Sequence, residues 1–192
     1  MGQQQRWFAM PRRRSVPNDH PAFAGLPISH ICLSTGIRAA VHVAGALSRA
    51  QLPLICIPGY QRNMSDFAAF AAGFRRSGDG NRPVVLLDLP GRGRADDRRL
   101  ASDYNTLTDA RDVAAIIMAL GLEQAVVLGQ GQGGQVAMAL AAAQPLLVAG
   151  AVLLDAGPVA DSRGIVRLRN NLAHVEGLRG AKAVTAGFRR IL

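Results

Sequence analysis

The sequence predicts an α/β fold built on a mostly parallel, doubly wound sheet. From residue 29 onward, short apolar runs of strand length alternate with longer segments that have helical periodicity. The expected strands are almost wholly apolar, which is typical of parallel strands covered by helices on both faces. These strands are residues 37–44, 52–57, 83–88, 125–128 and 149–154.

Three helices are expected between these strands. The second helix has the clearest signals, because Thr106 and Asp109 resemble a capping box at its start and Gly121 follows its apolar stripe. A third helix is expected after Gly134. The first helix carries large apolar side chains at the spacing of one helix face, and they are Phe67, Phe70, Ala71 and Phe74.

Length and composition indicate one folded domain with an uneven charge balance. The chain has 192 residues, of which 49% are hydrophobic and 18% are charged, so disorder is excluded. The net charge is +9, but all of the 22 basic residues except Lys182 are arginine, and they are mixed with acids. No nucleic-acid-binding module is recognised, and the pairs 75–76 and 98–99 are interpreted as solvated arginines. We therefore expect no nucleic-acid partner.

The chain carries no targeting or membrane-spanning segment that we recognise, and a cytoplasmic location is expected. No apolar signal-peptide region follows the start, and the long apolar stretch after Val136 is divided by Pro145. Cys32 and Cys56 both lie in apolar runs, which favours buried thiols over a disulfide bond. Residues 1–28 contain prolines and arginines without a period, so an extended N-terminal arm is expected there.

Three of the expected strands end in unusual loops that contain glycine, at residues 58–63, 90–93 and 129–134. The carboxyl ends of parallel strands meet at one edge of a sheet, where ligands of such folds bind. We therefore expect the three loops to lie together and to form the functional site.

From about residue 30 to 160 the chain resembles the α/β-hydrolase family. Residues 58–67 resemble the family's oxyanion loop, residues 88–94 its loop after the fourth strand, and residues 154–158 the segment that opens its cap. The resemblance implies the first six strands of that fold as a core at 29–160. It also implies the start of a helical cap at 161–192, with the chain ending early.

Residues 129–134 stand where the family carries its nucleophile elbow, G-x-S-x-G. Gly129 and Gly133 match the glycine positions, and Gly131 stands at the serine position, which leaves the nucleophile position vacant. The resemblance implies that the backbone N–H groups of Tyr60 and Gln132 are the oxyanion donors.

No histidine matches the family's catalytic position, and the four histidines are His20, His30, His42 and His174. The resemblance therefore implies a hydrolase of small ester, lactone or carbon–carbon substrates that is catalytically impaired or inactive. Gly59, Arg62 and Asp155 are the candidate contacts to a small-molecule ligand. No metal and no cofactor is expected.

The same glycines allow an alternative interpretation. Gly129-x-Gly131-x-x-Gly134 matches a dinucleotide fingerprint between a strand and a helix, and Asp155 follows at about the distance of a ribose-binding carboxylate. A helix N-terminus without a serine side chain could also receive an anion. Separately, residues 149–154 would form an uncharged sheet edge, so self-association through this edge is expected.

Overall fold

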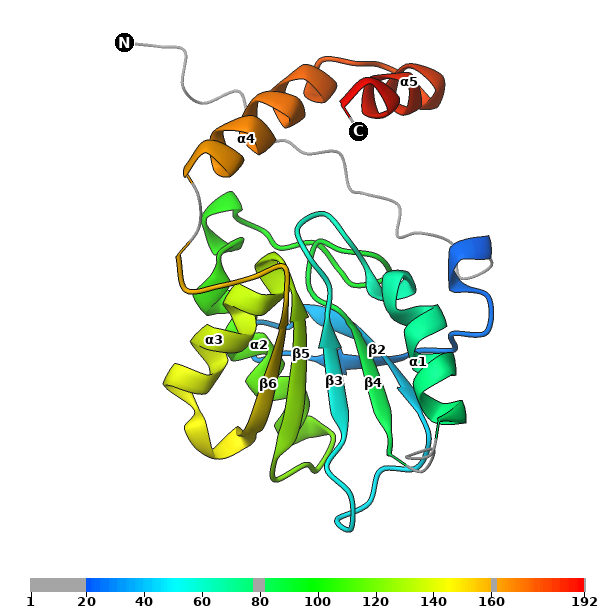
Figure 1. Ribbon diagram of the computed structural model, residues 1–192, viewed down its shortest axis with the longest axis vertical. Helices are drawn as coiled ribbons and strands as arrows, with labels where there is room; N and C mark the ends of the chain where they lie inside the picture. The colour runs from blue at the N-terminus through cyan, green and yellow to red at the C-terminus, as the bar shows by residue number, and fades with distance from the viewer. Residues whose placement is uncertain (1–19, 78–81, 160–161, 192) are drawn as a thin grey trace. The chain divides into compact units, whose positions relative to one another are not determined.

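The computed structural model describes residues 20–77, 82–159 and 162–191 (Figure 1). The chain divides into two compact units, Met1–Ala156 and Gly157–Leu192. The first unit contains the sheet and its helices, and the second contains a pair of helices.

The described residues of the first unit form a six-stranded sheet in the order β1-β2-β4-β3-β5-β6. β2 is antiparallel to both of its neighbours, β1 and β4, whereas β4, β3, β5 and β6 run parallel to one another. The predicted fold class is therefore confirmed. The strands are β1 (Ser29–Cys32), β2 (Arg38–Ala44), β3 (Leu54–Ile57), β4 (Val84–Asp88), β5 (Ala125–Gln130) and β6 (Val148–Leu154).

Helices cover the two faces of the sheet (Figure 1). α1 (Ala68–Arg76) packs on one face, and α2 (Thr106–Ala119) and α3 (Gln132–Ala143) pack on the other. Alternate residues of each strand point to opposite faces. Ile55 and Leu87 therefore lie in the cluster with α2 and α3, while Cys56 lies in the cluster with α1.

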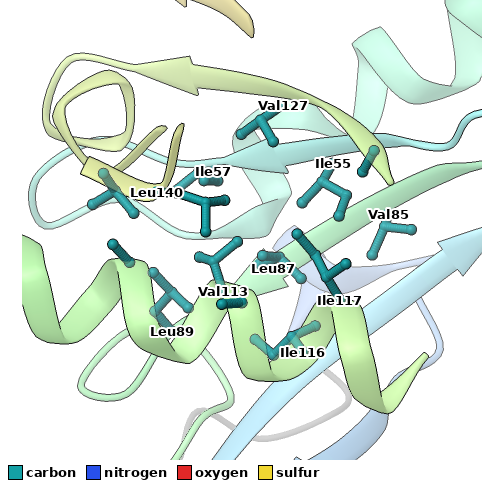
Figure 2. Packing of buried hydrophobic residues seen from close by; sticks show 14 of the residues in the cluster. Ile55, Ile57, Val85, Leu87, Leu89, Val113, Ile116, Ile117, Val127 and Leu140 are labelled. Carbon is teal, nitrogen blue, oxygen red and sulfur yellow. The ribbon is translucent and has the colours of Figure 1, made fainter. Parts of the chain in front are cut away.

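The cluster beneath α2 and α3 is the larger part of the core (Figure 2). Its branched and aliphatic side chains are almost completely removed from solvent, which is the main source of stability in such a domain. Figure 2 labels ten of them, namely Ile55, Ile57, Val85, Leu87, Leu89, Val113, Ile116, Ile117, Val127 and Leu140.

Two helix starts differ from the sequence predictions. α2 is capped by Asn105, whose side chain accepts a hydrogen bond of 2.9 Å from the N–H of Thr108. The predicted capping role of Asp109 is wrong, because its carboxylate binds two arginines instead. α3 begins at Gln132 and not after Gly134, so two glycines lie in its first turn.

The last part of the expected N-terminal arm packs against the domain. Pro21–Phe23 forms a short 3-10 helix, and the side chains of Phe23 and Leu26 are buried in the cluster beside α1. Residues 1–19 of the expected arm lie outside the described residues.

The second unit consists of α4 (Ser162–Glu176) and α5 (Ala181–Ile191). Gly187 of α5 is buried, and a Cβ at this position would overlap the side chain of Leu178. The glycine therefore allows a close approach within this helix pair. In the part of the chain that the structure describes, no helix has the length and hydropathy needed to cross a bilayer.

Candidate active site at the carboxyl edge of the sheet

The loop after β3 and the loop after β5 lie against each other, as the sequence predicts for parallel neighbours. Ile57 at the end of β3 is paired in register with Gly129. A Cβ on Gly59 would lie 3.2 Å from the carbonyl oxygen of Gln130, and one on Gly133 would overlap the carbonyl of Ile57. These close approaches bring residues 58–60 beside residues 129–133.

The turn between β5 and α3 is sharp, and Gly131 stands at its apex. Gly131 has φ 51° and ψ −114°, a conformation that side-chain-bearing residues rarely adopt. Its N–H donates to the carbonyl of Leu154 over 2.8 Å, which ties the turn to the end of β6. A Cβ built on Gly131 would meet nothing within 4 Å, so the apex is open on this side.

The neighbouring glycines are required by space. A Cβ on Gly129 would overlap the backbone of Gly133, and a Cβ on Gly134 would overlap the side chain of Ala156. The turn can therefore close only with glycine at these positions, whereas the glycine at 131 is favoured by its backbone conformation.

The two expected oxyanion donors lie on the two loops that touch. Gln132 is the first residue of α3, where the N–H groups of a helix have no partner within the helix. Tyr60 follows Gly59 directly. Among the described backbone hydrogen bonds of loops and turns, neither the Tyr60 nor the Gln132 N–H acts as a donor.

Asp88, the last residue of β4, connects the loops after β3 and β4. Its buried carboxylate accepts hydrogen bonds from the N–H groups of Met64, over 2.7 Å, and Arg94, over 2.9 Å. Burial raises the pKa of Asp88, and these two hydrogen bonds oppose that shift. A Cβ on Gly93 would overlap the carboxylate. Asp88 thus fixes the backbone that follows the Tyr60 loop.

A buried ionic cluster, made of Arg92, Arg98, Asp109 and Asp112, lies between the loop after β4 and α2. Arg98 contacts Asp109 at 2.6 Å and Asp112 at 2.7 Å, and its side chain is 1% exposed. The prediction that Arg98 is solvated is wrong, because two carboxylates on α2 hold the guanidinium inside the protein. Burial raises the pKa of Asp112, and Arg98 opposes the shift.

Arg92 connects this cluster to the sharp turn. One of its nitrogens donates to Asp109 over 2.8 Å and to the side-chain oxygen of Gln132 over 3.3 Å. The sequence reasoning missed this contact. Asp109 and Asp112 lie four residues before Val113 and Ile116, on the apolar face of α2. Acids on an apolar helix face indicate buried, paired carboxylates, and this was the available signal.

The remaining candidate residues have simpler surroundings. Arg62 pairs with Asp66 at 2.6 Å and supports its own loop, with 59% of its side chain exposed. Asp155 is exposed and has φ 50° directly after β6. His30 and His42 donate to the carbonyls of Arg94 and Pro27. The described residues contain no cluster of side chains suited to a metal ion.

Comparisons with known proteins identify the relatives of this chain. The family model described as alpha/beta hydrolase fold matches residues 53–180. An alpha/beta hydrolase of known structure from Novosphingobium aromaticivorans is 31% identical, with a TM-score of 0.67 over 76% of this chain and 49% of that chain. A hydrolase from Pseudomonas aeruginosa, 21% identical, has a TM-score of 0.68 over 84% of this chain and 57% of that one, and shows the fold alone.

A curated relative from Paraburkholderia phymatum is 2-hydroxy-6-oxononadienedioate/2-hydroxy-6-oxononatrienedioate hydrolase. It is 29% identical over 119 residues, which are 62% of this chain and 38% of the relative. The chain thus spans about half the length, or less, of the Novosphingobium and Paraburkholderia proteins it matches. The family match covers more than half of the chain and agrees with the sheet order and the sharp turn after β5, so this chain belongs to the α/β-hydrolase fold family.

Proposed function

We propose that this chain binds small carbonyl compounds at the carboxyl edge of its sheet and does not hydrolyse them. The observation that carries the proposal is the backbone at Gly131, which has the conformation of a sharp strand-to-helix turn but no side chain. In this proposal Gly131 stands at the vacant nucleophile position, and the N–H groups of Tyr60 and Gln132 bind the substrate oxygen. Nucleophilic catalysis needs both an attacking atom and a base, whereas backbone donors alone stabilise charge.

The substrate class is proposed from the family and from the curated relative. Hydrolases of this type act on ester, lactone or carbon–carbon bonds, and the relative is named for a dioate that carries a 2-hydroxy and a 6-oxo group. A carbonyl oxygen of such a molecule is the group that Tyr60 and Gln132 would bind. Gly59 lets the loop approach the turn, and Arg62 and Asp155 are the candidate polar contacts at its rim. Both cysteines are free, which agrees with a reducing compartment such as the cytoplasm.

The test is a hydrolysis assay on p-nitrophenyl esters and small lactones. We expect these compounds to be hydrolysed no faster with the purified chain than in buffer alone. Two variants make the assay decisive. Gln132→Pro deletes one N–H at the first helical position, where proline is well tolerated, and Gln132→Ala keeps that N–H. Turnover that is lost in Gln132→Pro and kept in Gln132→Ala would overturn the proposal.

A dinucleotide or another anion is the second candidate ligand. It is favoured by the open apex at Gly131, which faces the N-terminus of a twelve-residue helix. Calorimetric titration with nicotinamide and flavin dinucleotides separates the two candidates. We expect binding no tighter than about millimolar. Micromolar binding that is lost in Asp155→Ala would favour a dinucleotide ligand over a small carbonyl compound.

A further inference from the structure

The first turn of α3 carries the Gln132 N–H that is proposed to bind a ligand oxygen. The carbonyl of the same peptide group, on Gly131, accepts hydrogen bonds from the N–H groups of Gly134 over 3.0 Å and Gln135 over 3.3 Å, so the Gln132 N–H moves with this turn. The turn lacks the side chains that usually stabilise a helix start, because Gly131 cannot cap it and residues 132–135 include no acid. Two of its residues are glycines, whose backbone freedom favours fraying. A side-chain contact that holds the turn must therefore come from another element.

The side chain of Gln132 makes such a contact. Its Oε1 atom accepts a hydrogen bond of 3.3 Å from a guanidinium nitrogen of Arg92, which lies on the loop after β4. Arginine is only a donor, so the amide oxygen of Gln132 has to face it. Within residues 131–134 only Gln132 has a side chain, because the other three residues are glycines. Gln132 is therefore the position at which a neighbouring element can hold the turn.

Arg92 is itself fixed at its side chain and at its backbone. The nitrogen that contacts the turn also donates to the buried carboxylate of Asp109 over 2.8 Å. Arg98 contacts the other oxygen of this carboxylate at 2.6 Å. The backbone N–H of Arg92 donates to the carbonyl of Leu89 over 3.0 Å, and its carbonyl accepts from the N–H of Ala95 over 3.1 Å. The guanidinium is therefore anchored beside the first turn of α3.

We propose that Arg92 is a positioning residue of the carbonyl-binding site and that it acts through the Oε1 atom of Gln132. By holding this side chain, Arg92 keeps the first turn of α3 in the conformation that presents the Gln132 N–H to a ligand oxygen. Arg92 does not itself touch the ligand. The inference rests on the proposed function, and it adds that the loop after β4 determines how tightly the site binds.

Two variants remove the contact from opposite sides. Arg92→Met deletes the guanidinium, whereas Gln132→Met deletes the acceptor and keeps both the backbone N–H and the ion pair of Arg92 with Asp109. We expect the NMR order parameter of the Gln132 amide, measured without ligand, to fall in both variants from about 0.85, the value of a rigid backbone, toward about 0.6. The amide of Met138, farther along α3, is the internal control and should not change. Circular dichroism shows that each variant is folded.

Titration with δ-valerolactone connects the contact to ligand binding. We expect Arg92→Met and Gln132→Met to raise the Kd by a similar factor of about two to ten, the range for one hydrogen bond. The double variant should bind no more weakly than either single variant, because both changes remove the same contact. An unchanged order parameter of the Gln132 amide in both variants overturns the proposal, whether or not the lactone binds. Losses of affinity that add up in the double variant overturn it as well.

The failure of this inference can be told apart from the failure of the proposed function. If the unmodified chain does not bind the lactone, the proposed function is wrong, and the order parameters measured without ligand still decide whether Arg92 holds the first turn of α3. If the unmodified chain and both variants bind the lactone with equal Kd, the proposed function stands and the positioning role of Arg92 is wrong.

Discussion

At the scale of single residues, the glycines of the sharp turn are required for different physical reasons. Gly133 is enclosed by the carbonyls of Ile57 and Pro58, whereas Gly131 has open space but a positive φ. Gly133→Ala must displace backbone, so we expect a loss of stability above about 3 kcal/mol. Gly131→Ala places a side chain in a sparsely populated backbone region without a clash, which should cost only about 1 to 3 kcal/mol. Urea unfolding of both variants measures the difference, and equal costs would contradict this explanation.

Asp88 gives a prediction for pH. Burial raises the pKa of Asp88 above the value near 3.8 of an aspartate in the unfolded chain. The folded chain therefore holds the proton of this carboxyl group more tightly than the unfolded chain does. The Asp88 contribution to the free energy of unfolding is therefore larger in acid and decreases as the pH rises through the folded pKa. Asp88→Asn removes the titration. Urea unfolding at about pH 4 and pH 7 measures the difference in the free energy of unfolding between the unmodified chain and this variant. We expect that difference to favour the unmodified chain more at pH 4 than at pH 7. A gain toward neutral pH would be the opposite result.

At the scale of elements, the ionic cluster joins the loop after β4 to α2. Arg98→Met would leave the buried carboxylates of Asp109 and Asp112 near each other, with one arginine fewer to pair with them. Breaking a buried ion pair in this way typically costs about 3 to 5 kcal/mol. Arg99→Met is the matched control, because Arg99 is the exposed neighbour and its loss should change stability by no more than about 0.5 kcal/mol. Similar urea midpoints for the two variants would show that the cluster does not stabilise the fold.

At the scale of the whole molecule, the net charge of +9 raises the question of a polyanionic partner. Several arginines are already paired with carboxylates, among them Arg38, Arg62 and Arg98. We expect labelled duplex DNA to bind only in the range typical of non-specific contacts, about 10⁻⁴ to 10⁻⁶ M, and to dissociate as salt increases. Fluorescence anisotropy at two salt concentrations measures this. Sequence-dependent nanomolar binding at physiological salt would contradict it.

The sequence predicted the sheet well because its signals are local. The apolar strands and the glycine-containing loops at their ends can be recognised without knowing what they contact. Five predicted strands appear with boundaries shifted by at most two residues. The roles expected for Gly131, Tyr60 and Gln132 stay predictions, because they rest on the resemblance, which fixes only their positions along the chain.

The parts that were missed depend on contacts between distant residues. Arg98 looks like a surface residue until the acids 11 and 14 positions later are folded against it. The contact of Arg92 with Gln132 spans 40 positions, and nothing local indicates it. The start of α2 was displaced by one residue, because Asn105 and Thr106 are both suitable caps and only the folded backbone selects between them.

The most direct test of the central claim follows the protein and a substrate in one NMR experiment. Isotope-labelled protein is titrated with δ-valerolactone while the lactone signals are recorded in the same tube. We predict saturable shifts of the Tyr60 and Gln132 amide signals, with the lactone opening no faster than in buffer. Faster opening of the lactone than in buffer would contradict a site that lacks a nucleophile. Chemical-shift changes at other residues, with the Tyr60 and Gln132 amide signals unchanged, would contradict a site in which these two amides bind a carbonyl oxygen.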